Sequence, residues 1–368
     1  MIPSGLLPTG FRDRLPPHAD AAAAAVGRML EAAFAHGYER VSPALAEFAD
    51  GLAGRLKAAR AQDLMRMTDP ASQRTLALRP DLTAQVGRIA ATRMAHHPRP
   101  LRLSYAGQVV KLRASQLRPE RELLQVGCEL VGLDSVAAAR EVVAVAIEAL
   151  EAAGVRGLTI DFTLPDLVDT LAAGPLPLAE DEVEAVRARL DAKDAGGLDG
   201  AGAAYLPLIE AAGPFAAAVE RLRAFDSAAV LASRLDGLEA IAASIGGRAT
   251  LTLDPTERHG FEYQSWLGFS IFADGVAGEI GRGGSYMIVR DSGEEPAVGF
   301  SLYIDPLVDA GLAAAPRRRL FVPLGADARV AERLRAEGWV TVCGLTPEDS
   351  AERQICTHVL VGDRPQPL

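Results

Sequence analysis

The sequence predicts an α+β protein built on a largely antiparallel sheet, with a helical region inserted into it. Two observations favour this class. Apolar residues alternate along several stretches, two of which are predicted to form a hairpin, and the segment 165–245 is mostly Ala-rich helical pattern with Pro and Gly breaks. Strands and helices also alternate at both ends of the chain, so a doubly wound parallel fold remains an alternative.

The composition is that of an ordinary globular protein with an acidic balance. Hydrophobic residues make up 49% of the 368 residues and charged residues 23%, enough for one large domain and a smaller one. The formal net charge of -10 disfavours a surface made for long contacts with polyanions, so we expect no nucleic-acid partner.

The same composition predicts a cytoplasmic protein without a metal or cofactor. The three cysteines are scattered and have no metal-ligand spacing, as suits a reducing compartment. No apolar run is long enough to span a membrane. Residues 1–17 contain Pro, Gly and Arg and lack the apolar segment of a signal peptide.

The first part of the chain alternates helices and strands around one long hairpin. Polar residues 113–122 separate the two apolar-alternating stretches of that hairpin, and 51–71 has no clear pattern. The predicted elements are a helix over 19–35, a strand over 38–42, a strand over 76–78, a helix beginning near Asp81 or Thr83, strands over 102–110 and 123–131, a helix over 136–153 and a strand over 157–163.

Strand patterns resume after the helical insertion. They cover 249–253, 261–272, 275–280 and 297–304. The end of the chain then predicts a small α/β module with strands over 320–323, 341–343 and 358–361 and a helix over 328–337. We therefore expect a core domain over 1–315, containing the insertion 165–245, and a C-terminal module over 316–368.

Four short stretches carry more information than the rest. Singly, each has an ordinary explanation, because Pro-Asp is common at helix starts and Gly-rich tetrads are usually turns. The first stretch is Leu7-Pro8-Thr9-Gly10-Phe11-Arg12-Asp13 with Leu15-Pro16, followed after a helix by Gly37-Tyr38-Glu39-Arg40-Val41-Ser42-Pro43. The second is Leu78-Arg79-Pro80-Asp81-Leu82-Thr83, and the third is Leu124-Gln125-Val126-Gly127-Cys128-Glu129-Leu130-Val131-Gly132. The fourth is Gly281-Arg282-Gly283-Gly284-Ser285-Tyr286, with Pro296-Ala297-Val298-Gly299-Phe300-Ser301 after it.

In this order the four stretches resemble the catalytic domain of the histidyl-tRNA synthetases and of their synthetase-like paralogues. The resemblance runs from about residue 5 to about residue 310 and matches the helical insertion only loosely. It implies a class II aminoacyl-tRNA synthetase-like core, with a mainly antiparallel sheet flanked by helices. It also implies a dimer formed through the first motif, around residues 37–43.

Several positions depart from the working synthetases. Lys111 and Arg113 replace the family's phosphate-gripping Arg and a nearby Glu, and Pro306 replaces an Arg that stacks on the nucleotide. A Lys lacks the planar fork of Arg, and Pro has no side-chain donor. A catalytic Arg and a pocket residue in a further family motif are matched by His259 and Gln264. These coordinated losses predict a chain that does not form an adenylate.

Other positions keep the chemistry of the family's amino-acid pocket. Asp81 and Thr83 match residues that hold the substrate α-ammonium group. Gln125 and Glu129, four residues apart on one strand and therefore on one face, match residues of the histidine pocket, and Tyr286 matches a Tyr that closes it. L-Histidine is thus a possible ligand. A pocket kept only for packing is the alternative.

The resemblance leaves three functions open. Synthetase-like paralogues without adenylation residues serve as regulatory subunits of ATP phosphoribosyltransferase, which makes a short-form catalytic subunit the expected partner and histidine feedback the expected role. An active histidyl-tRNA synthetase, or a related ATP-dependent amino-acid ligase, is the rival. A free-standing amino-acid or tRNA-binding adaptor is the third.

Overall fold

The computed structural model describes residues 6–53, 64–113, 119–258, 264–290, 293–313 and 318–368. The chain divides into two compact units, Met1–Ala313 and Ala314–Leu368, and each is described by itself below. Among the described residues, no helix is long and apolar enough to cross a membrane.

The larger unit is built on a nine-stranded sheet with the order β1-β5-β6-β12-β11-β10-β7-β9-β8. The β1/β5 and β7/β9 pairs are parallel and the other neighbours in this order are antiparallel. The largely antiparallel α+β class is therefore confirmed, and the doubly wound alternative is wrong. The strands are β1 (Glu39–Arg40), β5 (Leu101–Val110), β6 (Glu122–Val131), β7 (Leu158–Thr163), β8 (Gly213–Pro214), β9 (Ala249–Leu253), β10 (Gln264–Ala273), β11 (Gly281–Arg290) and β12 (Gly293–Tyr303).

The β5–β6 hairpin gives the sheet two different faces. Its register runs from Leu101 opposite Val131 to Val110 opposite Glu122. Side chains alternate between faces along a strand. Val126, Cys128 and Leu130 join the main apolar core on one face, whereas Gln125 and Glu129 point to the other.

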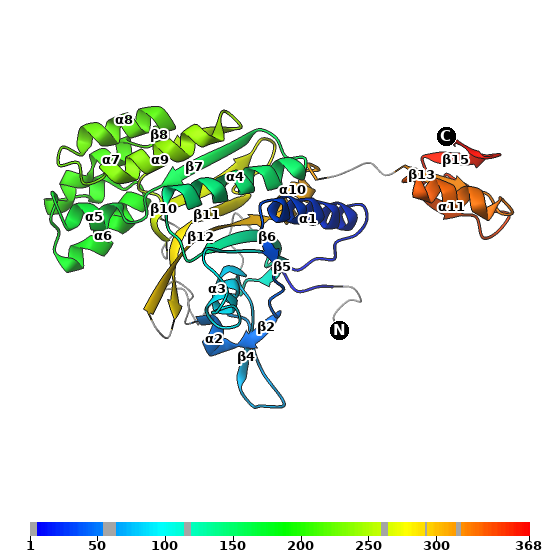
Figure 1. Cartoon of the computed structure of the whole chain (residues 1–368), viewed down its shortest axis with the longest axis horizontal. Coiled ribbons are helices and arrows are strands. Elements are labelled where there is room, and N and C mark those ends of the chain that lie inside the picture. The colour runs from blue at the N-terminus through cyan, green and yellow to red at the C-terminus, as the bar shows by residue number, and fades with distance from the viewer. Residues whose placement is uncertain (1–5, 54–63, 114–118, 259–263, 291–292, 314–317) are drawn as a thin grey trace. The chain divides into compact units, whose positions relative to one another are not determined.

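Helices cover the apolar face of this sheet. The core there is formed mainly by α1 (His18–Ala35), α4 (Val136–Ala152), α9 (Ala232–Ile245) and α10 (Ile304–Asp309). The α4 helix begins at Ser135, whose Oγ accepts a hydrogen bond from the Ala138 N–H, and it turns Val142, Val143 and Ile147 into the core. On the opposite face lies α3 (Thr83–Ala91), which packs Val86 and Ala90 in a smaller cluster; Figure 1 shows α1 and α3 on opposite sides of the sheet.

The predicted helical insertion is present as short helices. They are α5 (Leu167–Ala172), α6 (Glu180–Asp191), α7 (Pro207–Glu210) and α8 (Phe215–Phe225), with 3-10 turns at Ala195–Gly197 and Gly200–Tyr205, and the longer helix α9 ends the region. The region that had no clear pattern contributes to a separate small sheet of order β2-β4-β3, formed by β2 (Ala46–Phe48), β3 (Arg66–Thr68) and β4 (Thr75–Leu78) beside α2 (Ala49–Ala53).

One predicted strand is wrong. Residues 275–280 form turns rather than a strand, and the Gly-rich stretch that follows is the full strand β11. The glycines are needed because the sheet is crowded there. A Cβ on Gly283 would lie 2.3 Å from the Phe269 ring and 2.5 Å from the Gly299 carbonyl oxygen. Glycine therefore marks a close approach in this strand.

The smaller unit is an α/β module with a four-stranded sheet of order β14-β13-β15-β16. Its elements are β13 (Arg319–Val322), α11 (Ala328–Ala336), β14 (Val340–Cys343), β15 (His358–Val361) and β16 (Arg364–Pro367). The first three strands are parallel and β16 is antiparallel. Strand β16 was not predicted. Its two prolines argue against a strand inside a sheet, and β16 is found at the edge of this one, where proline is tolerated.

Candidate functional site

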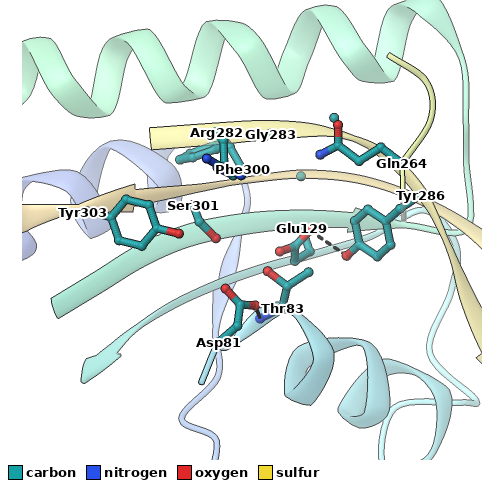
Figure 2. A pocket seen from close by; sticks show the side chains of 12 residues that line it. Asp81, Thr83, Glu129, Gln264, Arg282, Gly283, Tyr286, Phe300, Ser301 and Tyr303 are labelled. Atoms are coloured by element: carbon teal, nitrogen blue, oxygen red, sulfur yellow. Dashed lines mark hydrogen bonds between the residues drawn. The ribbon is translucent and has the colours of Figure 1, made fainter. Parts of the chain in front are cut away.

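A polar pocket lies on the α3 face of the nine-stranded sheet (Figure 2). Its cavity has a volume of about 20 Å³, room for about one water molecule. An amino acid would therefore have to displace side chains as it enters. The lining residues are Asp81, Thr83, Glu129, Gln264, Arg282, Gly283, Gly284, Tyr286, Gly299, Phe300, Ser301 and Tyr303.

Glu129 is the buried acid of this pocket, with an exposed fraction of 1%. Its Oε1 accepts a hydrogen bond of 2.9 Å from the Tyr105 hydroxyl, and its Oε2 accepts one of 2.7 Å from the Tyr286 hydroxyl. Burial raises the pKa of Glu129 to about 8, although both hydroxyl donors favour the charged form. Gly299 lies opposite Glu129 in the β12–β6 pair, where any Cβ would collide with the carboxylate.

Asp81 is held by a second group of hydrogen bonds. Its Oδ1 accepts the Thr83 N–H at 2.7 Å, at the start of α3, and its Oδ2 accepts the Gln125 amide at 2.8 Å. The same Gln125 nitrogen donates to Ser301 Oγ at 2.6 Å, while Gln125 Oε1 accepts the Leu82 N–H. Gln125 is fully buried, so this network fixes both the carboxylate and the helix start.

The structure brings together all five residues that the sequence proposed for a histidine site. Asp81, Thr83, Glu129 and Tyr286 line the cavity, and Gln125 lies beneath it, bonded to Asp81. Their role in binding histidine stays a prediction.

Sequence reasoning missed Tyr105 and Tyr303, and it singled out the stretch that contains Ser301 without giving Ser301 a role. The Tyr105 hydroxyl lies at the centre of the network, 3.2 Å from Thr83 Oγ1 and 3.0 Å from Ser301 Oγ. Tyr105 faces Gly127 across the hairpin, and a Cβ at Gly127 would meet its hydroxyl at 2.4 Å. A tyrosine that pairs with a glycine could therefore have identified Tyr105, but that signal is visible only when the register of the hairpin is known.

The two carboxylates of the pocket are its main free hydrogen-bonding capacity toward a ligand that donates. The hydroxyl and amide donors of Tyr105, Tyr286 and Gln125 already point at other protein groups, whereas each carboxylate oxygen can accept further bonds. Of the described lining residues only Arg282 carries a positive charge, and it forms a two-bond pair with Glu279. This balance favours a ligand that carries several N–H donors and a positive charge.

The departures from the synthetase pattern occupy different surroundings. Lys111 Nζ lies 5.7 Å from the centroid of the Tyr303 ring, and Arg113 is exposed. Pro306 is in the first turn of α10. Gln264 lines the pocket, and its Oε1 is buried without a hydrogen-bond partner among the described residues. His259 lies outside the described residues.

No group of three potential metal ligands occurs among the described His, Cys, Asp and Glu side chains.

Comparisons with known proteins place these features in a family. The family model described as histidyl-tRNA synthetase matches residues 10–307. An ATP phosphoribosyltransferase regulatory subunit from Rhodospirillum centenum is 45% identical, over 99% of this chain and 96% of its own. The corresponding subunit from Paramagnetospirillum magneticum is 42% identical, over 97% and 96%.

Solved structures agree on the fold. An ATP phosphoribosyltransferase regulatory subunit/histidyl-tRNA synthetase from Bacillus halodurans superposes with a TM-score of 0.81 at 22% identity, covering 98% of each chain. A histidyl-tRNA synthetase from Nostoc gives 0.79 at 15% identity, covering 98% of this chain and 92% of its own. At these identities the likeness establishes the class II synthetase-like architecture alone.

Proposed function

The chain belongs to the ATP phosphoribosyltransferase regulatory subunits, which share the histidyl-tRNA synthetase fold, and we propose that it works by binding rather than by chemistry of its own. Its partner is a separate short-form catalytic subunit, which joins ATP to phosphoribosyl pyrophosphate in the first step of histidine biosynthesis. On the same ground we propose that this chain works in the cytoplasm. L-Histidine, the end product, is the proposed ligand of the pocket.

The observation that carries the ligand proposal is the pair of carboxylates held in one small cavity. In the proposed complex Asp81 accepts hydrogen bonds from the α-ammonium group, and Thr83 lies beside it. Glu129 then accepts an imidazole N–H, because a carboxylate is the natural partner of that donor. The two tyrosine hydroxyls hold Glu129 in place for this bond.

The absence of adenylation chemistry follows from the residues that replace the synthetase cations. A nucleotide α-phosphate needs a donor with two parallel N–H groups, and Lys111 offers a single ammonium group beside the Tyr303 ring. Arg113 reverses the charge of the matched carboxylate. Pro306 supplies no side-chain donor to a nucleotide.

We therefore expect no histidine-dependent exchange of pyrophosphate into ATP above background. The measurement is the exchange assay on purified protein, with an active histidyl-tRNA synthetase as the positive control. A clear histidine-dependent signal would contradict the proposal and favour the ATP-dependent ligase.

The proposed assembly is a symmetric hetero-oligomer. A synthetase-type dimer, formed around residues 37–43, supplies a two-fold platform for the catalytic subunits. The net charge of -10 favours a protein partner over a nucleic acid and so argues against a tRNA-binding adaptor. Histidine alters catalysis only if it binds two states of the complex with different affinities, and that coupling is reciprocal.

Mixing this chain with the short-form catalytic subunit tests the partnership. We expect the two proteins to co-elute in sizing and the rate of phosphoribosyl-ATP formation to change severalfold. Histidine should then lower the rate of the complex. Separate elution, together with a rate that is indifferent to this chain, would contradict the assignment of partner.

A further inference from the structure

Tyr303 closes one end of the pocket. It is the last residue of β12, its exposed fraction is 7%, and it belongs to the same apolar cluster as Val109 and Leu123. Figure 2 shows its ring at the opposite end from Tyr286 and Gln264, with the hydroxyl directed toward Ser301. Lys111 Nζ lies 5.7 Å from the ring centroid. Because the ring is packed in this apolar cluster and lines the cavity, it forms part of the wall.

The strand registers give the order of groups along the pocket. Tyr303 lies opposite Gln125, and Ser301 lies opposite both Gly127 and Arg282. One step further, Gly299 lies opposite Glu129 and Gly284. Each step covers two residues, about 7 Å along a strand. The pocket therefore has three successive levels along the strands, which are marked in turn by Tyr303, Arg282 and Glu129.

This order gives a bound amino acid a direction. Glu129, at the Tyr286 end, suits a donor on the side chain, and Asp81 suits the ammonium group. Lys111 carries a positive charge beside the Tyr303 ring. Arg282 lies midway between Tyr303 and Glu129, and its charge is paired with Glu279. Asp81 is itself at the Tyr303 end, because its Oδ2 is bonded to Gln125, which lies opposite Tyr303. The α-carbon, with its ammonium and carboxylate groups, therefore belongs at that end, and Lys111 favours the carboxylate beside the Tyr303 ring.

We propose that Tyr303 is the wall that limits this pocket to a free amino acid and rejects ligands extended beyond the α-carboxylate. The inference rests on the proposed binding of histidine and adds a specificity determinant to it. A regulatory site has reason for such a wall: it must respond to the free end product and ignore histidine at the start of a peptide.

Binding of three ligands tests the wall by calorimetry: L-histidine, histidylglycine, which is extended at the carboxylate, and glycylhistidine, which is extended at the amine. The wild type should bind histidylglycine about a hundredfold more weakly than histidine, because the extra residue overpacks the site. In Tyr303→Ala that ratio should fall to about tenfold or less. Glycylhistidine should stay weak in both proteins, because its histidine has an amide in place of the α-ammonium group that Asp81 would hold.

Tyr303→Phe is the matched control, because it keeps the ring and should keep the wild-type ratio. Tyr303→Leu shortens the side chain while retaining apolar volume. If thermal melting shows Tyr303→Ala to be unfolded, the ratio of the two affinities is measured in Tyr303→Leu instead. Equal binding of histidine and histidylglycine by the wild type, or an unchanged ratio in the folded shortened variant, would overturn this inference alone. A wild type that binds no histidine overturns the proposed function, and this inference with it.

Discussion

Replacing Glu129 with alanine should weaken the binding of L-histidine by about ten- to a hundredfold. Glu129 is the buried acceptor at the side-chain end of the pocket, and losing a charged hydrogen-bond partner costs on the order of 1.5–3 kcal/mol. Calorimetric titration of the wild type and of Glu129→Ala measures this loss directly.

Two further variants make that experiment specific. Glu129→Gln keeps the shape and can still accept an N–H but carries no charge, so its affinity should fall between those of the other two proteins. Glu122→Gln alters a carboxylate at the far end of the same strand, outside the pocket, and should leave the affinity unchanged. Wild-type affinity in Glu129→Ala would move the histidine site elsewhere, for instance to the junction with the catalytic subunit.

The hairpin that carries Glu129 is the part of the fold best predicted from sequence. Apolar residues alternate on both sides of a polar connection, and β5 and β6 begin within one residue of the predicted strands. Alternation alone also placed Gln125 and Glu129 on one face, which the pocket confirms. The local pattern is sufficient here because the two strands follow one another in sequence and pair with each other.

Strand β11 shows where local pattern fails. Its segment Gly281-Arg282-Gly283-Gly284 has the composition of a turn, but it forms a strand because it pairs with β10 on one side and β12 on the other. The glycines are needed because these neighbours come too close for a side chain at their positions. At Gly284 an added Cβ would lie 2.3 Å from both Gln264 Oε1 and the Leu267 carbonyl oxygen. Such crowding arises from tertiary packing, which overrides the propensity of the segment.

The centre of the site was missed for a related reason. Tyr105 and Ser301 are 196 positions apart in sequence, and their hydroxyl oxygens meet at 3.0 Å because β12 pairs with β6. No periodicity in either strand predicts that pairing. The resemblance supplied residues that match a known pocket, Tyr286 among them, but it gave no hydrogen-bond network. Tyr105, and the bonds that hold Glu129, therefore required the structure.

The buried Glu129 should also make the unliganded protein less stable as pH rises. Its pKa lies at about 8 in the folded chain against 4.5 for an ordinary Glu, mainly because burial penalises the charged form. Between these values the native state holds a proton that the unfolded state has lost. Stability from this group is therefore present at low pH and falls as pH rises toward 8, by about 1.4 kcal/mol per pH unit.

Glu129→Gln removes this titration while keeping the size of the side chain. The variant's stability relative to the wild type should therefore rise by about 2 kcal/mol between about pH 6 and about pH 8, and then level off. Urea unfolding across this range, without histidine, measures the difference. Tyr286→Phe is the companion variant. It removes a hydroxyl that favours the charged carboxylate, so its stability should go on falling to higher pH than that of the wild type. A difference between Glu129→Gln and wild type that stays constant with pH would mean that Glu129 titrates at its ordinary pKa, and that the cavity holds a carboxylate already charged before any ligand arrives.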